Sequence, residues 1–310
     1  MSRLLFIGSV VADVLVRIPS LPHHAGDDLH VSSQKFALGG CGYNAFLSAR
    51  QMGGNAVLFA PVGTGLYGEW VQRRLAERGI TSALPQVQAP NGCCYCLVED
   101  DGERTFLSDH GAEYLFRREW FDLLGDEVFD GVYICGLEIE EATGGNITAW
   151  LEEHPPRQLF FAPGPRITRI DASLMERIFA LHPILHLNDE EVCAWAGTTD
   201  VEAAALALHR ATGGSVIVTL GKDGTLVVEG GSITRQPGVQ VTVADTIGAG
   251  DSHIGAVMAF RSQGFSLQEA AAMANHVSAQ VVAREGAGLP DDEAQLLYMQ
   301  LMNGGNRHGD

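Results

Sequence analysis

Short apolar runs alternate with Ala- and Leu-rich segments along this chain, and this alternation limits its possible folds more than any other feature. Residues 3–10 and 56–61 form apolar runs of strand length, whereas residues 45–52 and 68–78 have the spacing of helices. Strands and helices that follow each other in this order are typical of a parallel sheet with helices on both faces. The sequence therefore predicts an α/β fold.

The alternation resumes after residue 128, and helices dominate from Asp251 onward. Further strands are expected near residues 131–135, 158–162, 184–187, 215–220 and 225–228. We find no internal repeat or linker, and 46% of the residues are hydrophobic, enough for a large core. We therefore expect one domain over residues 1–303 and a flexible tail over residues 304–310.

Two segments depart from this order of strands and helices, roughly residues 11–36 and 92–108. Their apolar residues recur with a period of two. In the second segment, Asp100-Asp101-Gly102 is a hairpin turn signal. We expect the two segments to form a small separate sheet.

The charge of the chain excludes one class of partner. Its 38 acidic residues outnumber its 20 basic ones, and the formal net charge is −18. Nucleic-acid binding draws on clustered Lys and Arg, so we do not expect a nucleic-acid partner. ATP is still compatible, because backbone N–H groups, a helix N-terminus and Mg²⁺ bind phosphate locally.

No apolar stretch of membrane-spanning length and no secretory signal is found in the sequence, so we expect a cytoplasmic protein without a membrane partner. The six cysteines include no CxxC pair. We favour reduced structural thiols over a soft-metal or redox site at Cys93, Cys94 and Cys96.

A glycine-rich turn at residues 245–251, with the sequence DTIGAGD, precedes the helical run 252–260. Small residues before a helix expose several N–H groups at the positive end of its dipole, which suits an anion. Asp251 ends the turn, where it is either an N-cap or a base that deprotonates an attacking hydroxyl. The pattern by itself leaves both roles open.

The residues of this turn resemble the C-terminal signature of the ribokinase-like (PfkB) carbohydrate kinases. Residues 39–45, GGCGYNA, resemble the N-terminal Gly-Gly-x-x-x-Asn signature of the same family and stand about 200 residues upstream, in the expected order. The chain has neither a Walker loop nor a GxGxxG turn after its first strand. The resemblance implies a ribokinase-like three-layer sandwich with a mostly parallel central sheet and a small β lid.

The resemblance also implies an activity, the transfer of the γ-phosphate of ATP to a hydroxyl of a carbohydrate. The enzyme would then be a phosphotransferase with an alcohol group as acceptor. In the family the last Asp of the turn is the catalytic base and the preceding amides form an anion hole. These roles fall on Asp251 and on Gly248, Ala249 and Gly250.

The resemblance places the acceptor site on residues near the N-terminal signature. These are Asp13, Gly39, Gly40, Asn44 and Glu138. For each the sequence leaves a structural alternative: a strand-end cap for Asp13, a tight turn and helix cap for residues 39–44, and a solvated acidic turn for Glu138. The family often has Asn two residues before the Asp, and Val11 stands there instead. Val11 removes a polar contact and argues against ribose.

The nucleotide site implied by the resemblance comprises Asn188, Thr219, Gly221, Gly224 and Asn275. Glu191 lies three residues after Asn188, on the same face of an expected helix start. The family resemblance suggests that Glu191 organises Mg²⁺ through water. Helix capping by Asn188 and Glu191 is the alternative.

A monovalent cation, K⁺, is a further suggestion of the resemblance. In ribokinase-like enzymes mostly backbone oxygens of the matching region hold it, and a cation there would fix the geometry of the anion hole. The matching residues are Asp245, Ile247, Arg284 and Gly286.

Two other functions remain open, and so does the assembly. A nucleoside kinase of the same family, including a pseudouridine-type kinase, would stack a base on a lid aromatic such as Tyr43 or Phe106. A catalytically silent sugar or nucleotide sensor is the alternative from another class. We expect a homodimer that pairs through the lid, with Cys93–Val98 as an exposed apolar run.

Overall fold

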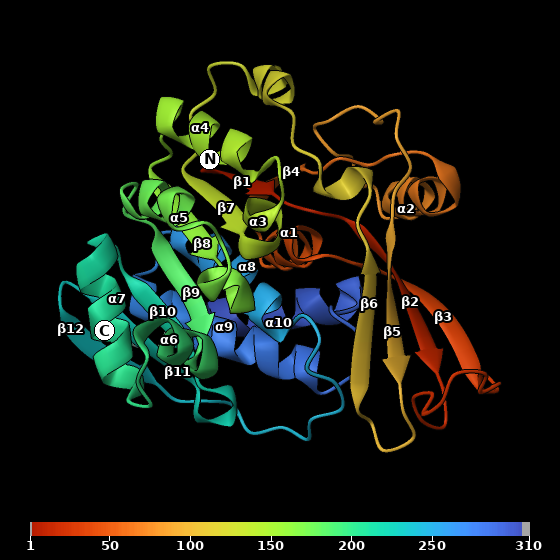
Figure 1. The fold of residues 1–310 in the computed structure, drawn as a ribbon. Coiled ribbons are helices and arrows are strands. Elements are labelled where there is room, and N and C mark those ends of the chain that lie inside the picture. The colour runs from red at the N-terminus through yellow and green to blue at the C-terminus, as the bar shows by residue number, and fades with distance from the viewer. Residues whose placement is uncertain (1, 306–310) are drawn as a thin grey trace.

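The computed structural model describes residues 2–305 and is built on one large sheet (Figure 1). Its strand order is β12-β11-β10-β9-β8-β7-β1-β4. The strands are β1 (Arg3–Ile7), β4 (Asn55–Phe59), β7 (Gly131–Cys135), β8 (Gln158–Ala162), β9 (Ile184–Asn188), β10 (Val216–Thr219), β11 (Thr225–Glu229) and β12 (Ser232–Gln236). All neighbours from β10 to β4 run parallel, and β11 and β12 add antiparallel pairs. The predicted mostly parallel sheet is confirmed.

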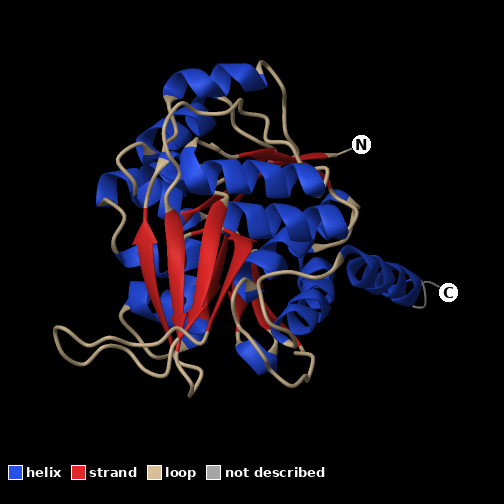
Figure 2. Ribbon diagram, turned by 90° about the vertical axis from the view of Figure 1, so that its right-hand side faces the viewer, coloured by secondary structure: helices blue, strands red, loops and turns tan. Residues whose placement is uncertain are grey.

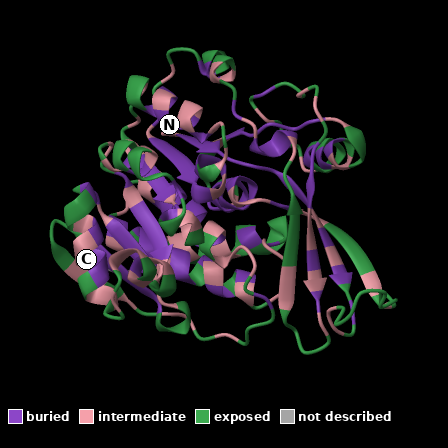
Figure 3. Ribbon diagram, in the orientation of Figure 1, coloured by how far each residue is buried: buried purple, intermediate pink, exposed green. Residues whose placement is uncertain are grey.

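Helices cover both faces of this sheet. One face carries α1 (Cys41–Gln51), α8 (Ala249–Ser262), α9 (Leu267–Val282) and α10 (Asp291–Gly305), and the other carries α4 (Gly144–Glu153), α5 (Ala172–Phe179), α6 (Asp189–Ala196) and α7 (Val201–Thr212). Successive side chains of β1 enter opposite cores, Leu4 and Phe6 on the α1 side, Leu5 and Ile7 on the α4 side. Strands buried on both faces need such continuous apolar runs. The predicted three-layer sandwich is confirmed (Figure 3).

A second sheet of four strands stands beside the large one, at the right of Figure 1. Its order is β3 (Ser33–Gly39), β2 (Val11–Arg17), β5 (Cys93–Val98), β6 (Arg104–Asp109). The outer pairs are antiparallel and β2 pairs with β5 in parallel. We call it the small sheet. Its strands come from the two segments predicted to form it, and the turn at Asp100–Gly102 closes the β5–β6 hairpin.

One face of the small sheet packs on α2 (Gly65–Glu77). Phe36 of β3 lies 5.6 Å from Trp70 between ring centroids, and the hydroxyl groups of Tyr95 and Tyr67 are 2.8 Å apart. Strand pairing then places Asp13 on the opposite face, because its register partner Cys94 neighbours Tyr95 in β5 and points the other way. That opposite face is free of α2 and is available to a ligand.

One sequence prediction is wrong in detail. The run Cys93–Val98 is not an exposed patch, because β5 is an inner strand whose residues Cys93, Cys96 and Val98 are buried. α10, at the edge of the molecule in Figure 2, extends to Gly305, and residues 306–310 of the predicted tail lie outside the described part.

Within residues 2–305, no helix combines the length and the apolar composition needed to cross a membrane. All six cysteines are free thiols. No group of three or more His, Cys, Asp or Glu side chains in the described part of the chain is placed to hold a metal ion.

Candidate active site

The glycine-rich turn leads directly into α8. Gly248 is the N-cap, with φ 71°, and a Cβ on it would lie 2.7 Å from the Cβ of Ala287, so only glycine fits. The helix begins at Ala249, which places Asp251 inside the first turn. The N-cap role considered for Asp251 is therefore wrong. The N–H groups of Gly250 and Asp251 have no acceptor within α8, because they belong to its first turn.

Asn44 of α1 points at the carboxylate of Asp251. Its Nδ2 donates a hydrogen bond to Asp251 Oδ2 at 3.0 Å. The two helices approach closely, since Ser48 Oγ donates to the carbonyl of Ser252 at 2.6 Å and Gly255 leaves room for the backbone of α1. Burial raises the pKa of Asp251 to about 6, and the hydrogen bond from Asn44 opposes this rise. A carboxylate with this pKa is suited to accept a proton near neutral pH.

The start of α1 lies against the acceptor residues. Gly40 is its N-cap, with φ 96°, and a Cβ there would lie 2.6 Å from the carbonyl oxygen of Ser9. The carboxylate of Asp13 lies so close to Gly39 that any side chain at Gly39 would overlap it. Asp13 stands in the middle of β2, which excludes the strand-end cap considered for it. Burial, and then the charge of Asp251, raise the pKa of Asp13 to about 7.

Glu138 is fully buried, so the solvated acidic turn considered for it is wrong. It lies in α3 (Gly136–Glu140), directly after β7, and accepts the N–H of Ser9 at 2.7 Å and the thiol of Cys135. Desolvation raises its pKa. Since β1 lies between β4 and β7, the strand order reverses at this point, where open α/β sheets form their ligand crevice.

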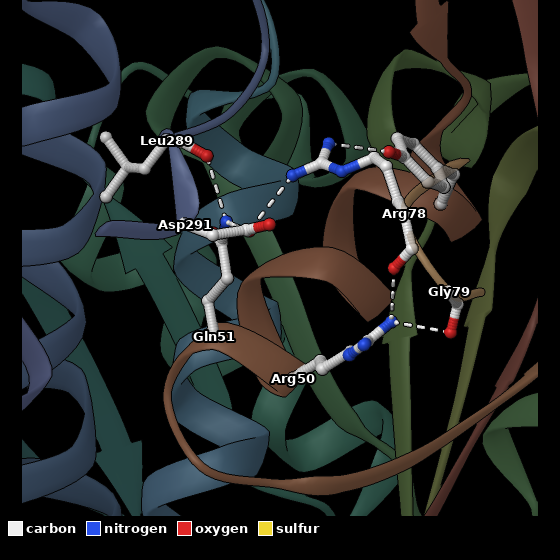
Figure 4. A network of polar contacts seen from close by, with 7 residues as sticks. Arg50, Gln51, Arg78, Gly79, Leu289 and Asp291 are labelled. Carbon is white, nitrogen blue, oxygen red and sulfur yellow. Dashed lines mark hydrogen bonds and ion pairs between the residues drawn. The ribbon is translucent and has the colours of Figure 1, made fainter. Parts of the chain in front are cut away.

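A polar network anchors α1 from behind (Figure 4). Arg78 donates to the hydroxyl of Tyr43 at 2.9 Å and to Asp291 Oδ1 at 3.0 Å, and Gln51 donates to the same Asp291 oxygen at 2.8 Å. Tyr43 is buried and bound in this way, so it is not free to stack on a nucleobase as considered. The network fixes the helix that carries Asn44.

The predicted nucleotide residues gather at the carboxyl ends of β9 and β10. Asn188 is the register partner of Thr219, whose hydroxyl donates to the carbonyl of Leu187 at 3.3 Å. Gly221 and Gly224 form the turn into β11, both with positive φ. The backbone is open at Gly221, where a Cβ would meet nothing within 4 Å, whereas Gly224 is buried against the backbone of residues 236–238.

Asn188 and Glu191 form a reciprocal capping box on α6. The N–H of Glu191 donates to Asn188 Oδ1 at 2.8 Å, and the N–H of Asn188 donates to Glu191 Oε2 at 3.0 Å. The capping alternative is thus realised. Burial raises the pKa of Glu191, and the charge of Glu191 contributes to raising the pKa of Asp251. A single carboxylate fits Mg²⁺, which keeps several waters and takes further ligands from phosphate.

Asn275 of α9 is committed to contacts inside the protein. Its Oδ1 accepts from Thr225 Oγ1 and from His253 Nε2, and its Nδ2 donates to the carbonyl of Pro237 at 3.0 Å. Since Asn275 Oδ1 accepts from His253 Nε2, this nitrogen carries the proton, and His253 Nδ1 accepts from His186 Nε2 at 3.0 Å. Burial lowers the pKa of His253 to about 4, so the ring stays neutral. His253 is therefore a buried core residue.

The predicted cation residues are only partly brought together. Asp245 is buried and accepts the N–H groups of Ile247 and Gly286, both at 2.9 Å. The side chain of Arg284 turns away to Glu293. The Asp245 carboxylate therefore faces backbone donors.

Arg104 of the small sheet completes this cluster, and sequence reasoning missed it. Its guanidinium pairs with Asp245. Burial raises the pKa of Asp245, but the hydrogen bonds from Arg104, Gly286 and Ile247 outweigh this effect and lower it. The period-two pattern of residues 104–109 was the signal available, since it places Arg104 on the same sheet face as Asp13.

This fold has known counterparts among solved structures. A ribokinase from Thermotoga maritima has a TM-score of 0.83 at 22% identity, covering 98% of this chain and 99% of its own. A nucleoside kinase from Burkholderia thailandensis, in complex with inosine, has a TM-score of 0.77 at 16% identity, covering 97% of each chain. The protein is therefore an α/β protein of the ribokinase fold.

The sequence comparisons are more specific than the fold. The family model described as pfkB family carbohydrate kinase matches residues 1–294. The uncharacterized sugar kinase YegV of Escherichia coli K12 is 32% identical over 295 residues, covering 94% of this chain and 92% of YegV. This chain belongs to the pfkB family of carbohydrate kinases. Enzymes of this family are phosphotransferases with an alcohol group as acceptor.

Proposed function

We propose that this protein transfers the γ-phosphate of ATP to a hydroxyl of a carbohydrate, with Asp251 as catalytic base. One observation carries the proposal: the Asp251 carboxylate lies in the same helical turn as the N–H groups of Gly250 and Asp251, which have no acceptor within α8. A base and an anion site thus stand side by side. Asp251 takes the proton of the acceptor hydroxyl while the N–H groups of Gly248, Ala249 and Gly250 stabilise the transferred phosphoryl group.

The acceptor binds between the small sheet and the start of α1. Asp13 offers a carboxyl group to its hydroxyls, and Asn44 holds Asp251 toward the reacting one. Glu138 is buried and supports this site by holding the backbone of Ser9. Gly39 and Gly40 let the start of α1 pack closely against Asp13 and Ser9, which supports their assignment to the acceptor site. Val11 is buried and apolar, which disfavours ribose as the acceptor.

ATP binds at the carboxyl ends of β9 and β10, with Thr219, Gly221 and Gly224 along the nucleotide. Asn275 supports this turn from behind, because its partner Pro237 packs on Gly224. Mg²⁺, when bound, neutralises phosphate charge. Glu191 would hold its water ligands, and the carbonyls near Asp245 would hold a monovalent cation.

The test is an ADP-release screen over pentoses, hexoses, sugar acids and nucleosides, with Mg²⁺ and with or without K⁺. Asp251→Asn is expected to lower turnover by roughly 10²- to 10⁴-fold without lowering the melting temperature. Asp292→Asn, an exposed first-turn carboxylate of α10, is the matched control and keeps full turnover. If Asp251→Asn retained most of the turnover, another group would be the base. Undetectable turnover with every acceptor would favour the sensor function instead.

A nucleoside kinase is the second candidate, and one observation favours it. Phe106 of β6 lies on the same face of the small sheet as Asp13, with 54% of its surface exposed. A free aromatic ring at this place suits a nucleobase. If the acceptor is a nucleoside, Phe106→Ala raises its KM and leaves the KM for the free sugar unchanged. Equal effects on both acceptors would exclude base stacking.

We also propose a homodimer that pairs through the small sheet. The edge strands β3 and β6 expose Phe36 and Leu107, at 43% and 54%. Exposed apolar edges of this kind are rarely left uncovered. Light scattering coupled to size-exclusion chromatography distinguishes a dimer, which Leu107→Lys would weaken, from a monomer.

A further inference from the structure

Arg104 forms a contact between the small sheet and the loop before α8 that the proposed chemistry does not use. It is the first residue of β6, and its guanidinium pairs with the carboxylate of Asp245, of which only 1% of the side chain is exposed. The Nε atom of Arg104 is buried without a hydrogen-bond partner. One donor of the guanidinium group therefore stays unsatisfied. The ion pair with Asp245, and not a good fit in the small sheet, accounts for the position of this side chain.

The strand register shows where Arg104 stands relative to the acceptor site. Arg104 pairs with Val98, which pairs with Arg17 of β2. Arg17 lies four residues after Asp13 in the same strand, so all these side chains share one face of the small sheet. Asp13 therefore lies toward one end of this face, and Arg104, which contacts Asp245, lies toward the other end.

Two other ion pairs join the small sheet to the loop after α9, but both involve an exposed partner. Arg17 and Lys35 reach Glu285 at 3.0 and 3.9 Å, and the Glu285 side chain is 62% exposed. Exposed pairs of this kind contribute little, whereas loss of the partner of a buried carboxylate is costly. Arg104 is thus the decisive one of the three contacts.

Asp245 links Arg104 to the anion site through hydrogen bonds to the backbone. Its carboxylate accepts the N–H of Ile247, within the glycine-rich turn, and the N–H of Gly286. Ala287, the next residue after Gly286, lies against Gly248 at the start of α8. The guanidinium, the carboxylate and these two N–H groups therefore form one connected unit that ends at the anion site.

We propose that Arg104 is a positioning residue: from the small sheet it holds Asp245, and through Asp245 it sets the N–H groups of the glycine-rich turn for the transferred phosphoryl group. The inference rests on the proposed kinase function and adds how the acceptor side and the phosphate side are coupled. When the small sheet lies over the acceptor, the anion site is complete. When it moves away, the turn loses one of its supports.

Hydrogen exchange tests the coupling without any substrate. Arg104→Met is expected to speed amide exchange at residues 246–250 by about 10-fold or more, while Arg17→Met, the matched control whose partner is exposed, leaves it unchanged. In turnover assays Arg104→Met is expected to lower kcat by about 10- to 100-fold and to change the KM for the acceptor little. Unchanged exchange and unchanged kcat in Arg104→Met would overturn the proposal.

A double variant tests whether Arg104 acts through Asp245. If it does, Arg104→Met combined with Asp245→Asn is no slower than Asp245→Asn alone; additive losses would overturn the proposal. Arg104→Lys keeps the charge without the planar fork and is expected to restore part of kcat, which also covers the case that Arg104→Met does not fold. The exchange measurements do not depend on turnover. Failure of this coupling can therefore be distinguished from failure of the proposed function, which Asp251→Asn tests.

Discussion

Asn44 Nδ2 donates a hydrogen bond to Asp251 Oδ2 at 3.0 Å, although the two residues are 207 positions apart in the chain. The contact joins the two signatures of the sequence in one site. It also orients the carboxylate that we propose as the base and stabilises its ionised form.

Asn44→Ala is expected to shift the pH dependence of kcat/KM. In the native protein the pKa of Asp251 is about 6, and the hydrogen bond from Asn44 is one cause that lowers it. Without this bond the pKa rises, so the acid limb of the profile moves to higher pH by roughly one unit. Ser48→Ala, which removes a hydrogen bond between the same helices without touching Asp251, leaves the limb in place. A limb that did not move in Asn44→Ala would show that Asp251 does not govern it.

Asp13→Asn is expected to stabilise the ligand-free protein at alkaline pH while it weakens acceptor binding. The pKa of Asp13 is raised from 3.8 to about 7, so between these values the folded state binds more protons than the unfolded state. The free energy of unfolding therefore falls as pH rises through this window, and the destabilisation by ionised Asp13 is complete above pH 7. The variant removes it and gains roughly 2–4 kcal/mol at pH 8, but much less at pH 4. Denaturant unfolding at both pH values measures the difference; an equal gain at both would exclude this cause.

Glu191→Gln distinguishes a role of Glu191 in holding Mg²⁺ from its role in capping α6. Gln also completes a capping box, so the variant keeps α6 intact and removes only the charge. We expect an unchanged melting temperature and a several-fold higher Mg²⁺ concentration for half-maximal turnover. An unchanged Mg²⁺ dependence would leave capping as the whole role of Glu191.

Gly248→Ala is expected to destroy activity, whereas Gly79→Ala is tolerated. Both glycines have positive φ, 71° and 61°, so both variants carry a similar backbone strain of about 1 kcal/mol. A Cβ at Gly79 meets nothing within 4 Å, but at Gly248 it meets Ala287 beside the anion site. Turnover and melting temperature of the two variants, measured side by side, distinguish strain from obstruction. Equal losses of turnover would mean that strain alone accounts for them.

The fold was largely predictable because it follows from local patterns. The strands at 131–135 and 158–162 were predicted at their observed bounds, since a strand buried on both faces is a continuous apolar run. The separation of the small sheet followed from its period of two. The exposed run at 93–98 was predicted wrongly, because sequence does not show that β5 lies between β2 and β6.

The site was predictable only where residues match a signature. Asp251, Asn44 and Asp13 were named from the sequence, but the choice between capping and chemistry depended on where each helix and strand begins. Asn188 proved to be a cap and Asp251 did not. The pair of His253 with His186, and the role of Tyr43, depend on buried contacts that no local pattern encodes.

The sequence by itself determined the α/β class, the two signatures and the residue types that can hold a proton, a phosphate or a sugar hydroxyl. Only the tertiary structure decided which of them meet. The packing of α1 on α8 brings Asn44 to Asp251, and the docking of the small sheet brings Arg104 to Asp245. The physical reason is that hydrogen bonds and ion pairs act over a few ångströms, whereas the chain positions they join are set by how whole helices and sheets pack.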